Sequence, residues 1–179
     1  MSETVVGPDQ AFRRDDAPNI EEIPLDSVVA SFSHAGEDFR VLRQVHNIES
    51  SSYSYLVLDK EQVAQGEITG KHAKIGKASN FIPRSTENFS KTTKRPIPHL
   101  MSTAIGEIVL QSEEGLIWHS SPILSRQGRR MYEGLSKEVE TEGSRFYDKL
   151  QVNKWVSRYD GFDHARYTIQ KLGRDDETQ

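Results

Sequence analysis

The segment WHSSPILSRQGRRMYEGL contains residues that together could bind a phosphate-like anion. The apolar spacing after Pro122 predicts a helix, and Ser125 is a plausible N-cap for it. A helix N-terminus presents unpaired N–H groups and the positive end of the helix dipole, and both favour anions. The residues that we expect to form this site are Ser125, Arg126, Gln127, Gly128, Arg129 and Arg130. An ordinary capped helix with solvated arginines is the alternative.

A second candidate lies in GSRFYDKLQV, residues 143–152. Tyr147 lies beside an apolar stripe with helical spacing, so it is either a half-buried helix aromatic or a side chain that faces a cleft. The spacing predicts one long helix after Ser125, or two helices joined near Gly143. The stripe consists of Met131, Leu135, Val139, Phe146 and Leu150.

Alternating apolar residues and turn residues predict three hairpins. In residues 26–47, VVASF fits a helix or a strand, and FRVLRQV alternates like a strand. The expected fold class is therefore α+β: a mostly antiparallel mixed sheet with a long helix in the C-terminal half. The expected hairpin strands are Tyr53–Leu58 with Val63–Thr69, Thr103–Gln111 with Leu116–His119, and Trp155–Tyr159 with His164–Leu172.

The chain of 179 residues is long enough for one domain with a real core. We expect that domain to span residues 28–172. Residues 1–27 predict a flexible acidic arm, because they lack apolar periodicity, and residues 173–179 predict a disordered tail. Residues 71–99 contain three prolines and little periodicity, which predicts a long loop.

The expected loop carries much of the positive charge of the chain. The formal net charge is −4, but residues 67–100 hold seven basic and two acidic side chains. Such a loop could bind single-stranded nucleic acid or an acidic protein partner, cover a cleft, or simply be solvated. Its cations, interleaved with Phe81 and Phe89, are Lys71, Lys74, Lys77, Arg84, Lys91, Lys94 and Arg95.

Other classes of function lack the residues that they need. The chain has no cysteine, which excludes disulfides and thiolate sites, and its six histidines are scattered, so we expect no metal. The sequence has no P-loop, nucleophile-elbow or paired-carboxylate pattern. It also lacks the apolar run of a membrane span and the pattern of a signal peptide, so we expect a cytoplasmic protein.

The order of these elements resembles the GCN5-related N-acetyltransferase (GNAT) family. In that family a strand-to-helix loop binds the pyrophosphate of acetyl-CoA through a Q/R-x-x-G-x-G/A motif, and a later helix often carries F-Y-x-K-x-G-F. FYDKLQV matches the second motif at Phe146, Tyr147 and Lys149. Aligned on Gly128, the first motif departs from the family at both ends, with Ser125 in place of Gln/Arg and Arg130 in place of the last small residue. The family also has a strand between the two motifs, which splays from its neighbour to admit the pantetheine arm, and no clear strand stands there in this sequence.

The resemblance implies an acetyl-CoA-dependent N-acyltransferase, or a degenerate relative that keeps the fold without catalysis. The residues from Ser125 to Arg130 would then bind the cofactor, and Tyr147 would protonate the departing thiolate. A base must take the proton of the attacking amine, and Glu107 and His119 lie on expected strands that would line the cleft. Each of the three residues also fits an ordinary structural role. The acceptor amine could belong to a small molecule or to a protein, and the oligomeric state is left open.

A function of a different class is a small non-enzymatic interaction protein. It would engage nucleic acid or an acidic protein through the loop at residues 71–99, and its binding would weaken with salt. A compact chain with charged, loose ends is also typical of proteins encoded by viruses or mobile elements.

Overall fold

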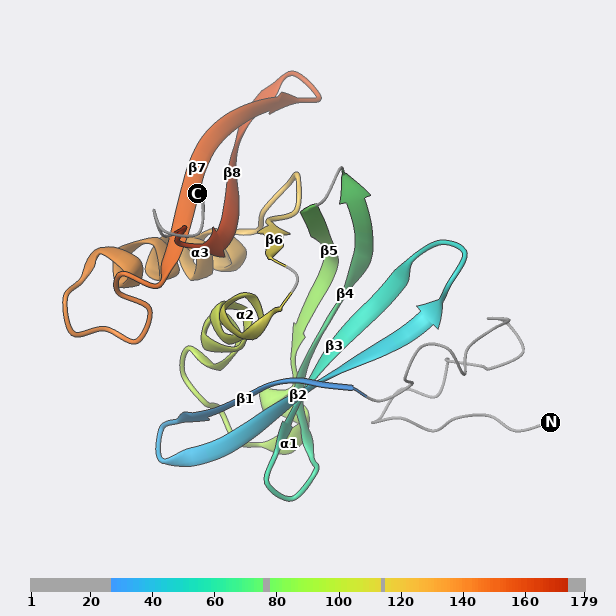
Figure 1. The fold of residues 1–179 in the computed structure, drawn as a ribbon, viewed down its shortest axis with the longest axis vertical. Coiled ribbons are helices and arrows are strands. Elements are labelled where there is room, and N and C mark those ends of the chain that lie inside the picture. The colour runs from blue at the N-terminus through green and yellow to red at the C-terminus, as the bar shows by residue number, and fades with distance from the viewer. Residues whose placement is uncertain (1–26, 76–77, 114, 174–179) are drawn as a thin grey trace.

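The computed structural model describes residues 27–75, 78–113 and 115–173, so the expected acidic arm up to residue 26 and the tail after residue 173 lie outside the described residues. The described residues form one sheet of eight strands in the order β1-β2-β3-β4-β5-β6-β8-β7 (Figure 1). The strands are β1 (Ser27–His34), β2 (Glu37–Asn47), β3 (Ser52–Asp59), β4 (Ala64–Ile75), β5 (Ala78–Asn88), β6 (Leu116–His119), β7 (Leu150–Tyr159) and β8 (Phe162–Lys171). The helices are α1 (Ser90–Thr93), α2 (Leu100–Gln111) and α3 (Arg126–Glu140).

The sheet is mixed, as expected, because one pair of its strands is parallel. Strands β1 to β5 form an antiparallel meander, and β5 then pairs in parallel with β6. Between these two strands the chain passes through α1 and α2, and between β6 and β7 it passes through α3. The closing hairpin of β7 and β8 joins the sheet through β8, which lies antiparallel to β6.

Two of the three expected hairpins are confirmed. β3 pairs with β4, and β7 pairs with β8 across Asp160 and Gly161, whose φ angles of 54° and 81° suit a two-residue turn. The ambiguous segment near the N-terminus forms β1 and β2. Ala35 and Gly36 connect them with φ angles of 52° and 78°, so this turn belongs to the same class.

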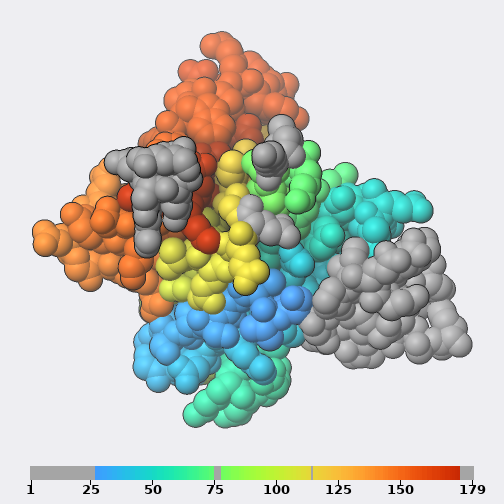
Figure 2. All heavy atoms as spheres, in the orientation of Figure 1, coloured from blue at the N-terminus to red at the C-terminus, as the bar shows by residue number. Residues whose placement is uncertain are grey.

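The third expected hairpin is wrong, because Thr103–Gln111 belongs to helix α2. All ten residues from Leu100 to Val109 are buried. A helix that is buried on every side loses the 3.6-residue period that distinguishes it from a buried strand. α2 packs against β1, β8 and α3. Figure 2 shows the segment of α2 and β6 between the N-terminal strands and the C-terminal hairpin.

The expected long basic loop at residues 71–99 is also wrong. Its residues form the end of β4, the whole of β5 and α1. β5 contains Pro83, which lies opposite Gly70 of β4. The pairing register shifts between Thr69 and Gly70, and such an irregularity allows a proline within a sheet. A side chain at Gly70 would collide with the backbone of Ile82 and Pro83. The second half of β5 is mostly exposed and polar. Its sequence therefore lacks the alternation of apolar and polar residues that predicts a strand.

The expected long helix in the C-terminal half is shorter in the structure. α3 ends at Glu140, and residues 141–149 form turns in which Gly143 has a φ angle of +88°. The apolar stripe continues across these turns, since Phe146 is fully buried. Its ring covers Gly106 of α2, where any side chain would collide with it.

An aromatic core lies at the parallel pair of strands. The ring centroids of Phe81 on β5 and Trp118 on β6 are 4.6 Å apart. Tyr55 of β3 contacts both rings, at centroid distances of 4.9 and 5.5 Å. All three side chains are buried. The two strands are therefore held together at this point and separate beyond it.

Candidate functional site

The candidate site is a cavity that opens where β5 and β6 diverge. The two strands pair over three residues, Ser79–Phe81 with Leu116–Trp118. Beyond this point β5 continues to Asn88, whereas β6 ends one residue later at His119. A cavity of about 760 Å³ lies in this gap. β5 contributes residues 83–86 and 88 to its lining, and the segment after β6 contributes residues 121 and 123–125. Residues of α2 and α3 form the rest of the lining. Crevices at the C-terminal ends of parallel strands are frequent ligand sites.

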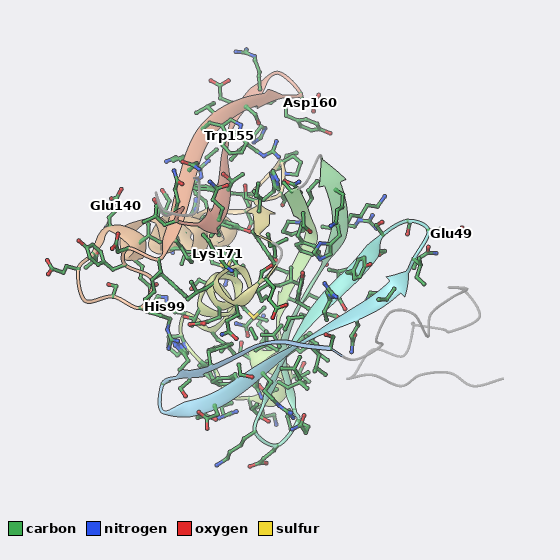
Figure 3. All side chains as sticks on the ribbon, viewed as in Figure 1. Glu49, His99, Glu140, Trp155, Asp160 and Lys171 are labelled. Carbon is green, nitrogen blue, oxygen red and sulfur yellow. The ribbon has the colours of Figure 1, made fainter. Side chains whose placement is uncertain are left out.

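The first turn of α2 faces this cavity. Leu100, Met101 and Ser102 line it together with His99, which is labelled in Figure 3. His99 precedes the helix with a φ angle of 61°, and its side chain does not cap the first turn. The positive end of the α2 dipole is therefore open toward the cavity, as in anion-binding sites.

The start of α3 also lines the cavity, but its first turn is capped. The Oγ atom of Ser125 accepts a hydrogen bond of 3.0 Å from the backbone N–H of Gly128. Of the six residues expected to bind the cofactor, Ser125, Gln127, Gly128 and Arg130 line the cavity, whereas Arg126 and Arg129 do not. Four of the six expected residues at the start of α3 therefore line the cavity. The helix N-terminus without a side-chain cap is that of α2.

Charged side chains of both signs surround the cavity. Arg84 of β5 and Arg130 of α3 bring guanidinium groups to it, and Glu138 of α3 brings a carboxylate. Burial raises the pKa of Glu138, an effect that Arg145, His99 and His34 oppose and that Glu107 reinforces. Protonation of Glu138 would remove a negative charge from the cavity, so an anionic ligand would bind more readily to the protonated form than to the ionised form.

Tyr132 forms a buried part of the cavity wall. Its hydroxyl accepts a hydrogen bond of 3.0 Å from the indole Nε1 of Trp118, and its ring stacks on that of Tyr167 at 5.4 Å. Burial raises the pKa of Tyr132 to about 12, while the bond from Trp118 acts in the opposite direction. The phenol therefore stays neutral at physiological pH and keeps a proton that it can donate.

The structure separates the three residues expected to be catalytic. Glu107 lies on α2 instead of a strand, and its carboxylate binds Arg145 at 2.9 Å and Gln111 at 2.7 Å. Tyr147 is 40% exposed in the turns after α3. Neither residue lines the cavity, so the geometry favours a structural role for Glu107 and a surface position for Tyr147.

His119 lies at the end of β6, next to the point where the strands separate. Its Nε2 atom is 2.8 Å from Oδ1 of Asn80 on β5. Burial lowers its pKa, and Arg166 lowers it further, so the imidazole is neutral at pH 7. Because Trp118 points into the core and successive strand residues point to opposite faces, His119 faces the other side of the sheet from α2.

Sequence reasoning missed the first turn of α2, Arg84, Tyr132 and Glu138. The signal for α2 was weak but present: Pro96 and Pro98 precede Leu100 where a helix begins. Arg84 was noted only as part of a basic loop. Tyr132 and Glu138 carry no local signal, because their importance depends on long-range packing.

The basic side chains expected to form one surface are divided by the hairpin of β4 and β5. Lys71 and Lys74 lie toward one end of it, whereas Lys91 and Lys94 lie in and after α1 at the other. Arg95 is engaged by Glu37 at 2.5 Å and by Asp59 at 2.9 Å. Binding of nucleic acid or an acidic partner at this segment stays a prediction.

Comparisons with known proteins give only distant likenesses. A search with models of protein families found no match, and neither did a search of curated protein sequences. Among solved structures, NAA60 of Arabidopsis thaliana, in complex with a bisubstrate analogue, is 13% identical with a TM-score of 0.34, over 68% of this chain and 75% of that one. Nourseothricin acetyltransferase is 11% identical with a TM-score of 0.32, over 86% of this chain and 94% of that one. At these TM-scores the likeness does not define the fold of this chain.

Two further features concern the described part of the chain. No helix within it is long and apolar enough to cross a membrane. No group of three or more histidine, aspartate or glutamate side chains within it could hold a metal ion.

Proposed function

We propose that the protein is an N-acyltransferase that binds acetyl-CoA or a related acyl-CoA in the cavity between β5 and β6. The observation that carries the proposal is the divergence of two parallel strands around a cavity of about 760 Å³, with an uncapped helix N-terminus and two arginines at its wall. A relative that keeps the cofactor site without catalysis is the degenerate form of the same proposal.

The order of elements supports this proposal through the resemblance to the GNAT family. That family has a strand between the phosphate-binding helix start and the F-Y-x-K motif. In this protein β6 stands between α2 and the residues Phe146–Lys149. The counterpart of the family's phosphate-binding turn is then the connection from β5 to α2, instead of the start of α3 at Ser125.

The residues at the cavity fit an acyl-CoA. The open first turn of α2, Arg84 and Arg130 suit the phosphate groups, because backbone N–H groups and guanidinium groups bind phosphate oxygens. Met101 and Met131 supply flexible apolar surface for the pantetheine arm. When bound, the cofactor supplies an acyl group activated as a thioester.

We propose two side chains for the proton transfers. Tyr132 lines the cavity, and its hydroxyl accepts from Trp118 and so has its own proton available, which is why we assign Tyr132 the role that the sequence suggested for Tyr147. His119 does not line the cavity, but it is neutral and lies at the end of the strand that borders the gap, so it is our candidate for the base that receives the amine proton. The acceptor amine would then approach from the face of the sheet opposite to α2.

Isothermal titration calorimetry with CoA and acetyl-CoA tests the proposal. We expect Arg84→Gln combined with Arg130→Gln to weaken CoA binding by roughly tenfold or more, because each arginine makes a charge-assisted contact. Arg126→Gln combined with Arg129→Gln is the matched control, since it removes the same charge outside the cavity. Pantetheine, which lacks the phosphates, should bind the parent and the first variant equally. No heat of binding at millimolar CoA would refute the proposal.

Turnover is tested separately from binding. Acetyl transfer to a panel of amines should be lost in Tyr132→Phe while CoA binding is retained, and Tyr147→Phe should leave it unchanged. Binding of CoA without transfer to any amine would identify the degenerate form.

A further inference from the structure

A second cavity, of about 420 Å³, lies under the C-terminal end of α2. The sheet forms its floor through β2, β3, β4 and β5, and the last turn of α2 with the residues after it forms its roof. The acyl-CoA cavity contacts residues 100–102 at the other end of the same helix. At 1.5 Å per residue the two cavities are roughly 10–15 Å apart along α2.

The floor of the second cavity combines one cation with neutral donors. Arg43 of β2 lies with its guanidinium carbon 5.6 Å from the ring centre of Tyr53. Tyr55 and His72 face the same space, and the Tyr55 hydroxyl is 2.7 Å from Nε2 of His72. The buried hydroxyl of Ser79 is beside them. A guanidinium with neighbouring hydroxyl and imidazole groups is the arrangement that recognises a carboxylate.

His72 does not add a second charge to this floor. Burial, and then the nearby Arg43, lower its pKa to about 4, so the ring is neutral at pH 7. Among the described residues that line the cavity, Arg43 is therefore the positively charged one at that pH. The floor favours a single anionic group.

The roof of the cavity favours the opposite charge. The C-terminal end of α2 carries the negative end of the helix dipole, and Glu113 brings an exposed carboxylate to the cavity. Lys171, labelled in Figure 3, donates to the carbonyl of Ser112 but does not line the cavity. Because Lys171 already occupies a carbonyl at this helix end, an ammonium group on a ligand would be attracted chiefly by Glu113.

The side wall at β1 is held in place by Gln111. Its Nε2 donates to the carbonyl of Ser31 at 2.9 Å, and its Oε1 accepts from the N–H of Ser31 at 3.1 Å. These two hydrogen bonds hold the C-terminal end of α2 against the edge strand β1. The roof of the cavity is therefore held at a set distance from the sheet before a ligand binds.

We propose that this cavity is a binding site for a free amino acid, with the carboxylate at Arg43 and the ammonium group toward Glu113 and the end of α2. The site uses none of the residues assigned to the acyl-CoA cavity, and it goes beyond the proposed acyl transfer.

The test is an NMR titration that follows the imidazole C–H signals of His72, first with an equimolar mixture of the twenty amino acids at millimolar concentration and then with each alone. We expect a saturable shift with at least one of them. The analogues of that amino acid that lack only the ammonium group or only the carboxylate should bind at least roughly tenfold more weakly. The absence of any shift with the mixture would overturn the proposal. Equal affinity for the analogue without the ammonium group would do the same, since it would indicate a plain anion site.

Variants locate the two charges of the ligand. Arg43→Gln should weaken binding by roughly tenfold or more, and Arg40→Gln, on an exposed position of the same strand, should leave it unchanged. Glu113→Gln should weaken binding several-fold, and because this side chain is exposed the variant should fold even if Arg43→Gln does not. Glu113→Gln could instead bind the amino acid as tightly as the parent and still prefer it to the analogue without the ammonium group. That result would contradict the proposal that Glu113 binds the ammonium group.

Discussion

Trp118 of β6 and Tyr132 of α3 are joined by a hydrogen bond of 3.0 Å from the indole to the phenol oxygen. Both side chains are buried, and Tyr132 also stacks on Tyr167 of β8. The bond therefore fixes α3 to the two strands that follow the gap in the sheet. Tyr132 also lines the proposed acyl-CoA cavity, so this hydrogen bond holds one part of the cavity wall in place.

The first prediction concerns stability at alkaline pH. The pKa of Tyr132 is about 12 in the folded protein, above the ordinary value of 10.0. Because the folded state holds this proton more tightly, the stabilisation is complete below pH 10 and is lost as the pH rises through 12. Two pKa units correspond to about 2–3 kcal/mol of unfolding free energy. Urea unfolding at a series of pH values measures it, and Tyr132→Phe should lack this part of the pH dependence. The same alkaline slope in both proteins would contradict the assignment.

The second prediction concerns mildly acidic pH. Burial lowers the pKa of His72 from 6.5 to about 4, so the unfolded chain binds a proton more readily than the folded one. The stabilisation is present above pH 6.5 and is lost as the pH falls through 4, with a total of about 3–4 kcal/mol. Unfolding of the parent and of His72→Gln at each pH separates this contribution from that of the carboxylates. NMR titration of the ring gives the pKa directly, and an ordinary value would refute the prediction.

The third prediction concerns Glu138 and the affinity for CoA. The pKa of Glu138 is raised, mainly by burial, and its ionised form places a negative charge in the cavity proposed for phosphates. We therefore expect CoA affinity to fall as the pH rises through the pKa of Glu138, and Glu138→Gln to bind several-fold more tightly at pH 7 with a weaker pH dependence. Glu140→Gln, exposed on the same helix, is the control. Equal gains in both variants would indicate a general charge effect.

The fourth prediction concerns the ion pair between Glu107 and Arg145. The Glu107 side chain is 9% exposed, and Arg145 also donates to the carbonyl of Ser33 on β1. Glu107→Gln leaves the guanidinium of Arg145, which is 32% exposed, without its carboxylate partner, so it should lower the unfolding free energy by about 1–2 kcal/mol.

The matched control for that variant is an exposed ion pair. Arg158 and Asp163 are 75% and 68% exposed and 3.7 Å apart, so Asp163→Asn should cost less than about 0.5 kcal/mol. Chemical denaturation compares the two variants. A loss of acyl transfer in Glu107→Gln without a loss of stability would instead support the catalytic role that the sequence suggested.

Local patterns predicted the hairpins at β3–β4 and β7–β8, because alternation and turn residues are local properties of the chain. They failed for α2, whose residues from Leu100 to Val109 are buried on every side and show no helical period. The error had a consequence for the site. With residues 103–111 expected to form a strand, the sequence offers only the helix at Ser125 for a phosphate, whereas the structure adds the start of α2 as a second candidate. Which of the two binds a phosphate stays a prediction.

The candidate site could be predicted only in part. The start of α3 was expected to bind an anion, and four of its six residues do line the cavity. The rest of the cavity depends on the parallel pairing of residues 79–81 with residues 116–118, a contact between distant segments that no spacing in the sequence encodes. The FYDKL motif predicted a role for Tyr147, which is exposed in the structure. Its neighbour Phe146 is buried and packs against Gly106 of α2.

The short strand β6 joins two larger parts of the sheet through few residues. It pairs with β5 at three positions and with β8 at two, whereas β3 and β4 pair at seven. We expect the meander of β1 to β5 and the hairpin of β7 and β8 to change their relative angle by straining these few hydrogen bonds, within the limits set by α2, which packs against both β1 and β8. Such a hinge would vary the width of the acyl-CoA cavity, and the amides of β6 are the place where hydrogen exchange would detect its movement.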